Sequence, residues 1–229
     1  MRGLLGAGGL CLFFVTLPIA FGAWEAQKAD QSVYRLRMGQ QLNLAQVRAG
    51  IAAFDRALAI WPTPERYLDR SELLGGAALT ATLDVPELER LRWVRRAAAD
   101  LEKGLAAAPV RGIDWLRLAA MRQTLDGASR DVLPPLFLSL DYAALIPSTW
   151  PTRFRIILDA WPYLDDAQKQ RLGNYMKAVW GATDRTKDRR IFAKAIHSPT
   201  DELIVRYFLR DVPGAQEEIT ALIKWEQTH

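Results

Sequence analysis

The chain has 229 residues, of which 50% are hydrophobic and 24% charged, a composition typical of a globular protein with a sizeable core. Its 30 Lys and Arg residues against 26 Asp and Glu residues give a net charge of +4. That excess is smaller than nucleic-acid-binding proteins usually carry, so no nucleic-acid partner is expected. Cys11 is the single cysteine. No disulfide can form within the chain, and the fold must depend on packing alone.

The chain begins with an apolar segment in which 22 residues, 3–24, carry no charge. As a helix this segment would extend roughly 33 Å, enough to cross a hydrocarbon core of about 30 Å. Trp24 stands where an interfacial aromatic anchor would lie, and Glu25 and Lys28 follow it. The segment therefore predicts a signal anchor or transmembrane helix over residues 1–24. It would contact membrane lipid through residues 3–24 and hold the protein in a bacterial inner membrane by a single span, with the rest in the periplasm.

A cleaved signal peptide is the alternative interpretation of the same segment. Pro18 interrupts the apolar stretch, and Ala20-Phe21-Gly22 resembles the small-x-small end of a cleavage site. In that case the protein is secreted to the periplasm after cleavage near Gly22.

The remainder of the chain shows apolar residues at helical spacing and almost no strand-like alternation, which predicts an all-α protein. After a first helix that continues to about Met38, we expect helices over 43–61, 64–80, 86–108, 112–126, 134–146, 151–161, 165–182, 187–197, 199–210 and 214–227.

Helix start signals support this map. Thr63-Pro64 and Ser198-Pro199 each offer an N-cap followed by a proline at the first helical position. Asp84 with Glu87, and Asp165 with Gln168, are spaced as capping boxes with Asp as the cap.

One spacing of small and large residues occurs twice and matches the second helix of a tetratricopeptide hairpin. Small residues at its first and third positions allow close helix approach, a large apolar residue fills the seam, and a proline follows. The two occurrences are Gly50, Phe54, Ala57 and Pro62, and then Ala97, Leu101, Gly104 and Pro109, with Trp115, Leu118 and Ala119 beyond. We therefore expect an α-solenoid-like array of degenerate tetratricopeptide-like hairpins over 25–126. Further helical hairpins would follow over 127–229, after the turn at Asp126-Gly127.

Catalytic signatures are missing from the sequence. There are two histidines, His197 and His229, and no pair of His, Cys or carboxylate residues has metal-ligand spacing. No phosphate-binding loop or nucleophile elbow occurs either. The pairs Asp165-Asp166 and Asp201-Glu202 begin predicted helices, where acidic residues stabilise the helix dipole. We expect no catalytic residue, no metal and no cofactor, and so no enzyme.

Basic and aromatic residues are the remaining candidates for a binding site. The basic cluster of Arg185, Lys187, Arg189, Arg190 and Lys194 could contact an acidic partner or an acidic polysaccharide, or could be a solvated helix face. Among the tryptophans, Trp61, Trp115 and Trp180 lie on apolar stripes and are expected in the core, whereas Trp150 and Trp225 are candidates for an exposed sugar-binding platform.

Taken in order, the chain resembles bacterial membrane-anchored proteins with tetratricopeptide-like helices that are associated with envelope exopolysaccharide biosynthesis. The matching stretches are 98–105 with Pro109, 115–119, 138–140, 153–158, and Trp161-Pro162 with Leu164. The resemblance implies an accessory or scaffold role and supplies no catalytic residues.

The leading hypothesis is a non-catalytic, membrane-anchored adaptor that holds together protein partners of an envelope polysaccharide pathway. A groove between stacked hairpins would bind the partner, with Arg92, Arg96, Arg117 and Arg122 as candidate contacts. The alternatives are a periplasmic polysaccharide-binding module and a polysaccharide-active enzyme that uses carboxylates alone.

Overall fold

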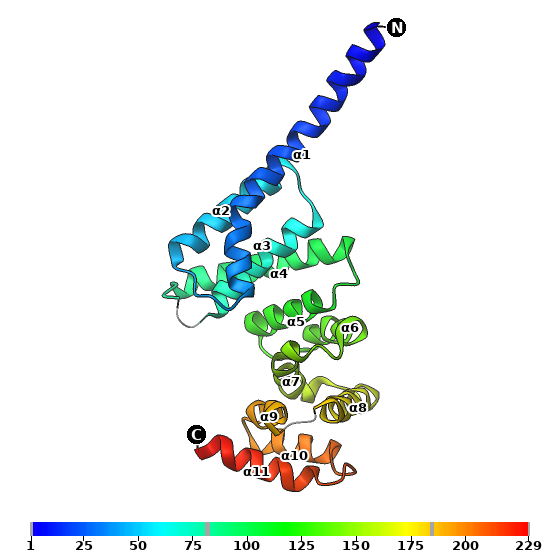
Figure 1. The fold of residues 1–229 in the computed structure, drawn as a ribbon. Helices are drawn as coiled ribbons and strands as arrows, with labels where there is room; N and C mark the ends of the chain where they lie inside the picture. The colour runs from blue at the N-terminus through cyan, green and yellow to red at the C-terminus, as the bar shows by residue number, and fades with distance from the viewer. Residues whose placement is uncertain (1, 81–82, 184–185, 229) are drawn as a thin grey trace. The chain divides into compact units, whose positions relative to one another are not determined.

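The fold was determined as a computed structural model, which describes the backbone of residues 2–80, 83–183 and 186–228, with side chains from residue 16 except 81–82, 184–187 and 229. Over that part of the chain every regular element is helical, which confirms the all-α prediction (Figure 1). The chain divides into two compact units, Met1–Val110 and Arg111–His229. The division falls after Val110, whereas the sequence analysis places a subdivision at Asp126-Gly127.

Unit 1 consists of two helical hairpins. Its helices are α1 (Arg2–Arg37), α2 (Leu44–Ile60), α3 (Pro64–Leu79) and α4 (Glu87–Ala107). α1 packs along α2 and α3 packs along α4, while α3 also contacts α1 and α2. The buried faces meet around Phe54, Leu73, Leu74 and Val94, none of which retains measurable exposure.

The predicted transmembrane helix is wrong. α1 runs through Pro18 and Trp24 to Arg37 as one helix, close to the expected end near Met38. Along the described residues, no helix combines the length and the apolar character that crossing a membrane requires. The single-span inner-membrane location predicted from residues 1–24 is therefore contradicted as well. The physical reason is that the later half of α1 belongs to the core of unit 1, where it carries charged residues and buries Ala29 and Val33.

Trp24, the predicted interfacial anchor, makes its contacts within α1. Trp24 is 54% exposed, its ring centroid lies 5.6 Å from that of Phe21 in an edge-to-face contact, and the Lys28 ammonium lies 3.8 Å from the Trp24 centroid. The predicted lipid contact begins at residue 3, and the side chains of residues 3–15 lie outside those described. The cleavage site predicted near Gly22 lies inside the continuous helix.

The repeated small-large-small pattern falls on the second helix of each hairpin, α2 and α4. Phe54, Ala57, Ala97 and Leu101 are all buried. Gly104 marks the closest approach of α4 to α3, because a Cβ at this position would lie 2.5 Å from the side chain of Leu68 and 3.2 Å from the Pro64 carbonyl oxygen. The pattern therefore locates helix contacts correctly. α5, expected to pair with α4, belongs to the second unit.

A buried arginine connects three helices of unit 1. Arg70 of α3 donates from Nε and Nη2 to the two carboxylate oxygens of Asp100 on α4, at 2.7 and 2.6 Å, and from Nη1 to Asp55 of α2 at 2.8 Å. Arg70 is 8% exposed and Asp100 is 2% exposed. Burial by itself would lower the pKa of Arg70, but the hydrogen bonds that it donates to both carboxylates raise this pKa overall. Arg70 therefore remains charged and holds α2, α3 and α4 together.

Unit 2 contains short helices joined by tight turns. They are α5 (Gly112–Asp126), η1 (Arg130–Val132), α6 (Leu133–Ala143), η2 (Pro147–Thr149), α7 (Trp150–Asp159), η3 (Trp161–Tyr163), α8 (Asp166–Ala182), α9 (Thr186–Ala195), α10 (Pro199–Phe208) and α11 (Ala215–Thr228). α5 packs on α6, α7 packs on α9, and α9 packs on α11.

The centre of unit 2 is an aromatic cluster contributed by α7, α8 and α9. The ring of Phe154 lies 4.6 Å from Phe192 and 5.8 Å from Tyr175, and Phe192 lies 5.1 Å from Trp180. All four side chains are buried. One contact is unusually tight: a Cβ at Gly173 of α8 would lie 1.9 Å from the ring of Phe208 on α10, so no larger residue fits there unless the ring moves.

Arg153 of α7 has no exposed surface and makes no ion pair with any described carboxylate. Its guanidinium donates instead to the carbonyl oxygens of Ala143 and Ala144 at 3.1 and 2.9 Å, and to the hydroxyls of Thr149 and Tyr175 at 3.0 Å each. These carbonyls end α6, where a helix leaves acceptors unpaired and the dipole favours a cation. Arg153 therefore ends α6 and fixes it to α7.

The predicted start signals are largely confirmed. Thr63 and Ser198 cap α3 and α10 ahead of a proline, and Asp165 forms a capping box with Gln168 at the start of α8. The box predicted at Asp84 and Glu87 is wrong, because Pro86 is the residue before α4 and no side chain caps that end.

Replacing Asp100 with Asn should lower the free energy of unfolding of unit 1 by about 3 kcal/mol, because the buried Arg70 would lose the carboxylate that accepts from both Nε and Nη2 and would keep only Asp55. Urea denaturation of the full chain measures this loss. Glu89→Gln is the control, since it removes a more exposed ion pair with Arg48 and should change the free energy by about 1 kcal/mol or less. Equal losses in the two variants would contradict the role assigned to Arg70.

Candidate functional site

The turn η3 is the best candidate for a binding site in unit 2. It joins α7 to α8 and is closed by hydrogen bonds from Tyr163 N to Ala160 O and from Leu164 N to Trp161 O, at 3.0 and 3.3 Å. Proline at its second position restricts the backbone further. Leu164 is buried and anchors the turn, whereas Pro162 and Tyr163 are exposed.

Three cavities lie against this turn, with volumes of about 540, 470 and 330 Å³. All three fall within the range of ligand-binding pockets. Pro162 and Tyr163 line the first, Trp161 lines the second, and Trp161 and Pro162 line the third. We call this region, the turn together with its three cavities, the η3 surface.

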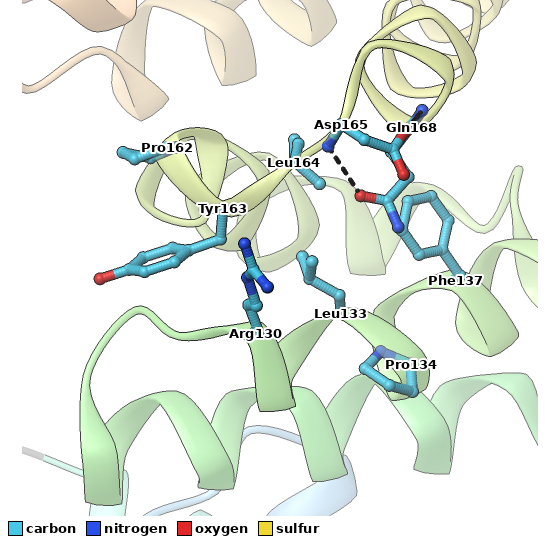
Figure 2. A pocket seen from close by; sticks show the side chains of 9 residues that line it. All are labelled: Arg130, Leu133, Pro134, Phe137, Pro162, Tyr163, Leu164, Asp165 and Gln168. Carbon is cyan, nitrogen blue, oxygen red and sulfur yellow. Dashed lines mark hydrogen bonds between the residues drawn. The ribbon is translucent and has the colours of Figure 1, made fainter.

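The first cavity lies between η1, α6, η3 and the start of α8 (Figure 2). Its lining consists of Arg130, Leu133, Pro134, Phe137, Pro162, Tyr163, Leu164, Asp165 and Gln168. Figure 2 shows the Arg130 side chain extending from η1 between the Tyr163 ring and Leu133. The lining combines leucine, proline and aromatic carbons with about as much polar surface, to which Arg130 contributes a positive charge.

The second cavity has an aromatic wall and several polar groups. It is lined by Trp161, Asp166, Lys169, Gln170, Leu203, Ile204, Tyr207 and Phe208. Trp161 and Phe208 meet edge to face at 5.4 Å, and the Lys169 ammonium lies 6.0 Å from the Trp161 ring centroid. Tyr207 and Leu203 are 57% and 68% exposed, so this wall is accessible from solvent.

The third cavity contains an ion-pair cluster that ties α7 to the turn between α9 and α10. Arg155 donates from Nε to Asp159 at 2.9 Å, and from Nη1 to Asp201 at 3.1 Å and to the Ala195 carbonyl oxygen at 2.6 Å. Burial would raise the pKa of Asp201, but the hydrogen bonds from Arg155 and from the backbone N–H of His197 lower it overall. A carboxylate held ionised in this way is suited to a structural ion pair rather than to donating a proton.

The acidic pairs singled out in the sequence act at helix starts. Asp165 is the N-cap of α8, and Asp201 and Glu202 lie in the first turn of α10, where Glu202 also pairs with Arg206. Among the described residues, no group of His, Cys, Asp and Glu side chains is arranged to hold a metal ion.

Two residues of the predicted basic cluster, Arg189 and Arg190, have partners within the protein. Arg189 donates to Glu218 and to the Thr183 carbonyl oxygen and lies over the Trp180 ring, and the Arg190 guanidinium lies 3.4 Å from the centroid of Trp225. Lys194 lines a separate cavity of about 520 Å³. The side chains of Arg185 and Lys187 lie outside those described.

The predicted tryptophan platform does not form. Trp150 is 6% exposed and Arg190 covers Trp225, so neither ring is a free flat surface. Trp180 is buried as expected, but Trp61 is 39% exposed, because it follows the end of α2 instead of belonging to its buried face.

The four arginines predicted to line one groove are distributed over both units. Arg92 and Arg96 belong to α4, whereas Arg117 and Arg122 belong to α5. Arg96 pairs with Asp55, Arg117 with Asp114, and Arg122 with the Asp131 carbonyl oxygen. Sequence reasoning did not select Arg130 or Tyr163; the available signal was the Trp-Pro-Tyr turn immediately before the Asp165 cap.

No known protein family, curated protein or solved structure matches this chain. The fold therefore defines the class, an all-helical protein of two units, and the resemblance to tetratricopeptide-like envelope proteins stays a prediction.

Asp201→Asn should lower the free energy of unfolding by about 1–3 kcal/mol at pH 7, because Asp201 accepts charge-assisted hydrogen bonds. Since the pKa of Asp201 is lower in the folded protein, this stabilisation is present above the unfolded pKa of about 3.9 and is lost as the pH falls through the folded value. Denaturation at pH 7 and below pH 4 should show the difference from wild type shrinking with acid. Glu202→Gln, which removes a more exposed pair, should cost about 0.5 kcal/mol. A difference that does not change with pH would contradict the prediction.

Proposed function

We propose that the chain is a non-catalytic helical adaptor that binds a protein partner at the η3 surface. The observation that carries this proposal is the grouping of three ligand-sized cavities around one rigid turn that exposes Pro162 and Tyr163. Exposed aromatic side chains beside apolar pockets are characteristic of protein-binding hot spots. The resemblance noted in the sequence suggests that the partner belongs to an envelope polysaccharide pathway.

The charged groups of the surface support binding over catalysis. Asp159 and Asp201 both receive hydrogen bonds from Arg155, and Asp165 is occupied as the cap of α8. A glycan-cleaving enzyme needs one carboxyl group that stays protonated near neutral pH. The lowered pKa of Asp201 does not favour that role.

A polysaccharide-binding module is the second candidate, and the second cavity is the observation that favours it. Trp161 and Tyr207 present aromatic rings there beside Lys169, Asp166 and Gln170, which together offer hydrogen-bond donors and acceptors. Binding of an acidic oligosaccharide that is lost in Tyr207→Ala but retained in Tyr163→Ala would promote this candidate over the adaptor.

The adaptor proposal is tested by photocrosslinking in cells of the source organism. A photoreactive phenylalanine analogue at position 163 should yield a discrete crosslinked protein. The same analogue at position 221, an exposed position of α11 outside the three cavities, should not. No crosslinked protein at position 163, or the same product at both positions, would contradict the proposal.

Tyr163→Ala should reduce co-purification of the crosslinked partner about tenfold, because removing an exposed aromatic anchor typically costs more than 1 kcal/mol of binding free energy. Its melting temperature should stay within about 2 °C of wild type, since the Tyr163 side chain is exposed. Tyr142→Ala is the matched control, because Tyr142 is similarly exposed on α6 but lines none of the three cavities. Equal recovery of the partner with both variants would count against the η3 surface.

A further inference from the structure

The first cavity presents mainly hydrogen-bond donors. Arg130 is exposed, and its guanidinium makes no hydrogen bond or ion pair with any described residue. The amide oxygen of Gln168 accepts from the Asp165 N–H at 3.0 Å, which leaves the Gln168 amide nitrogen as a donor. Tyr163 adds a hydroxyl at the rim. These groups favour a ligand that supplies acceptors.

The one carboxylate in the lining, Asp165, uses one of its oxygens to cap α8. Asp165 accepts the backbone N–H of Gln168 at 2.7 Å as part of the capping box of α8. Its position is fixed by that role at the helix start, and it makes no ion pair with Arg130. Because Arg130 pairs with no described carboxylate, its guanidinium is available to a carboxylate from outside the chain, with which it can form two parallel hydrogen bonds.

The apolar part of the lining defines the rest of the ligand. Leu133 and Leu164 are buried, Phe137 is partly buried, and Pro134 and Pro162 stand at the edges. A phosphate or a sulfate would leave this apolar surface unused. An aliphatic or aromatic side chain of a peptide would bury apolar area against Leu133, Phe137 and Leu164.

We propose that this cavity binds an extended acidic peptide segment of the partner. An aliphatic or aromatic side chain enters between Leu133, Phe137 and Leu164, and a neighbouring Asp, Glu or C-terminal carboxylate pairs with Arg130. The Gln168 amide nitrogen and the Tyr163 hydroxyl bind the backbone carbonyl groups of the segment. This inference rests on the adaptor function proposed above and names the chemistry of its partner.

The test begins with selection of random seven-residue peptides displayed on phage against the full chain. Wild type should enrich peptides in which Asp or Glu lies next to Leu, Phe, Tyr or Trp. The most enriched peptide is then synthesised with fluorescein and its binding measured by anisotropy. Exchanging its acidic residue for the amide should weaken binding at least tenfold. Failure to select any peptide, or selection without acidic residues, would overturn the proposal.

Charge reversal at Arg130 gives the sharper measurement. Arg130→Glu should weaken binding of the acidic peptide at least tenfold, and a peptide with Lys in place of its acidic residue should bind this variant better than it binds wild type. Arg95→Glu is matched in net charge, because Arg95 is exposed on α4 in the other unit, and it should bind the acidic peptide as wild type does. Unchanged binding in Arg130→Glu would overturn the proposal.

Competition distinguishes the other possible ligands. If inorganic phosphate or an oligogalacturonate displaces the peptide at low concentration and requires Arg130, the cavity recognises anions or acidic sugars and the peptide proposal falls. Arg130→Gln, which keeps a polar side chain of similar reach, repeats the measurement should the charge reversal disturb folding. A partner that crosslinks at position 163 while the selected peptides lack acidic residues would leave the adaptor function standing without this inference.

Discussion

Burial of an arginine guanidinium is the constraint on which each unit depends. A buried cation is tolerated only when its donors are satisfied, so the groups around it must be held in place. In unit 1, Arg70 obtains its partners from carboxylates, and satisfying it requires α2 and α4 to meet α3 at fixed positions. In unit 2, Arg153 obtains its partners from backbone carbonyls and hydroxyls instead. By ending α6 there, it fixes the helix whose first turns form one wall of the first cavity.

Local features of the fold could be predicted because they depend on neighbours in sequence. Helical spacing and the caps at Thr63, Asp165 and Ser198 place the corresponding helix starts within a residue or so of their observed positions. Long-range features were harder. The apolar run before Trp24 predicts a membrane span because no local pattern encodes the packing of α1 on α2 and α3. Trp61 was placed in the core from its spacing alone, although α2 ends at Ile60.

The site could be predicted only in part, because binding surfaces are made from elements distant in sequence. The first cavity joins Arg130 to Gln168, and nothing in the spacing of the chain shows that these two residues share a lining. A sequence shows where charged residues cluster, but it does not show whether their side chains already have partners within the protein. Arg189 pairs with Glu218, and Arg190 lies over the ring of Trp225. Arg130, which belongs to no cluster in the sequence, has no such partner among the described residues.

The tight contact at Gly173 links a residue outside the three cavities to the position of Trp161 on the η3 surface. Phe208 fills the space above Gly173, and its far edge meets Trp161, which forms a wall of two cavities. A methyl group added at position 173 would have to displace the Phe208 ring, and the displaced ring would press on Trp161. If the η3 surface binds a partner as proposed, a change at position 173 would alter the cavity wall without altering a residue that lines it.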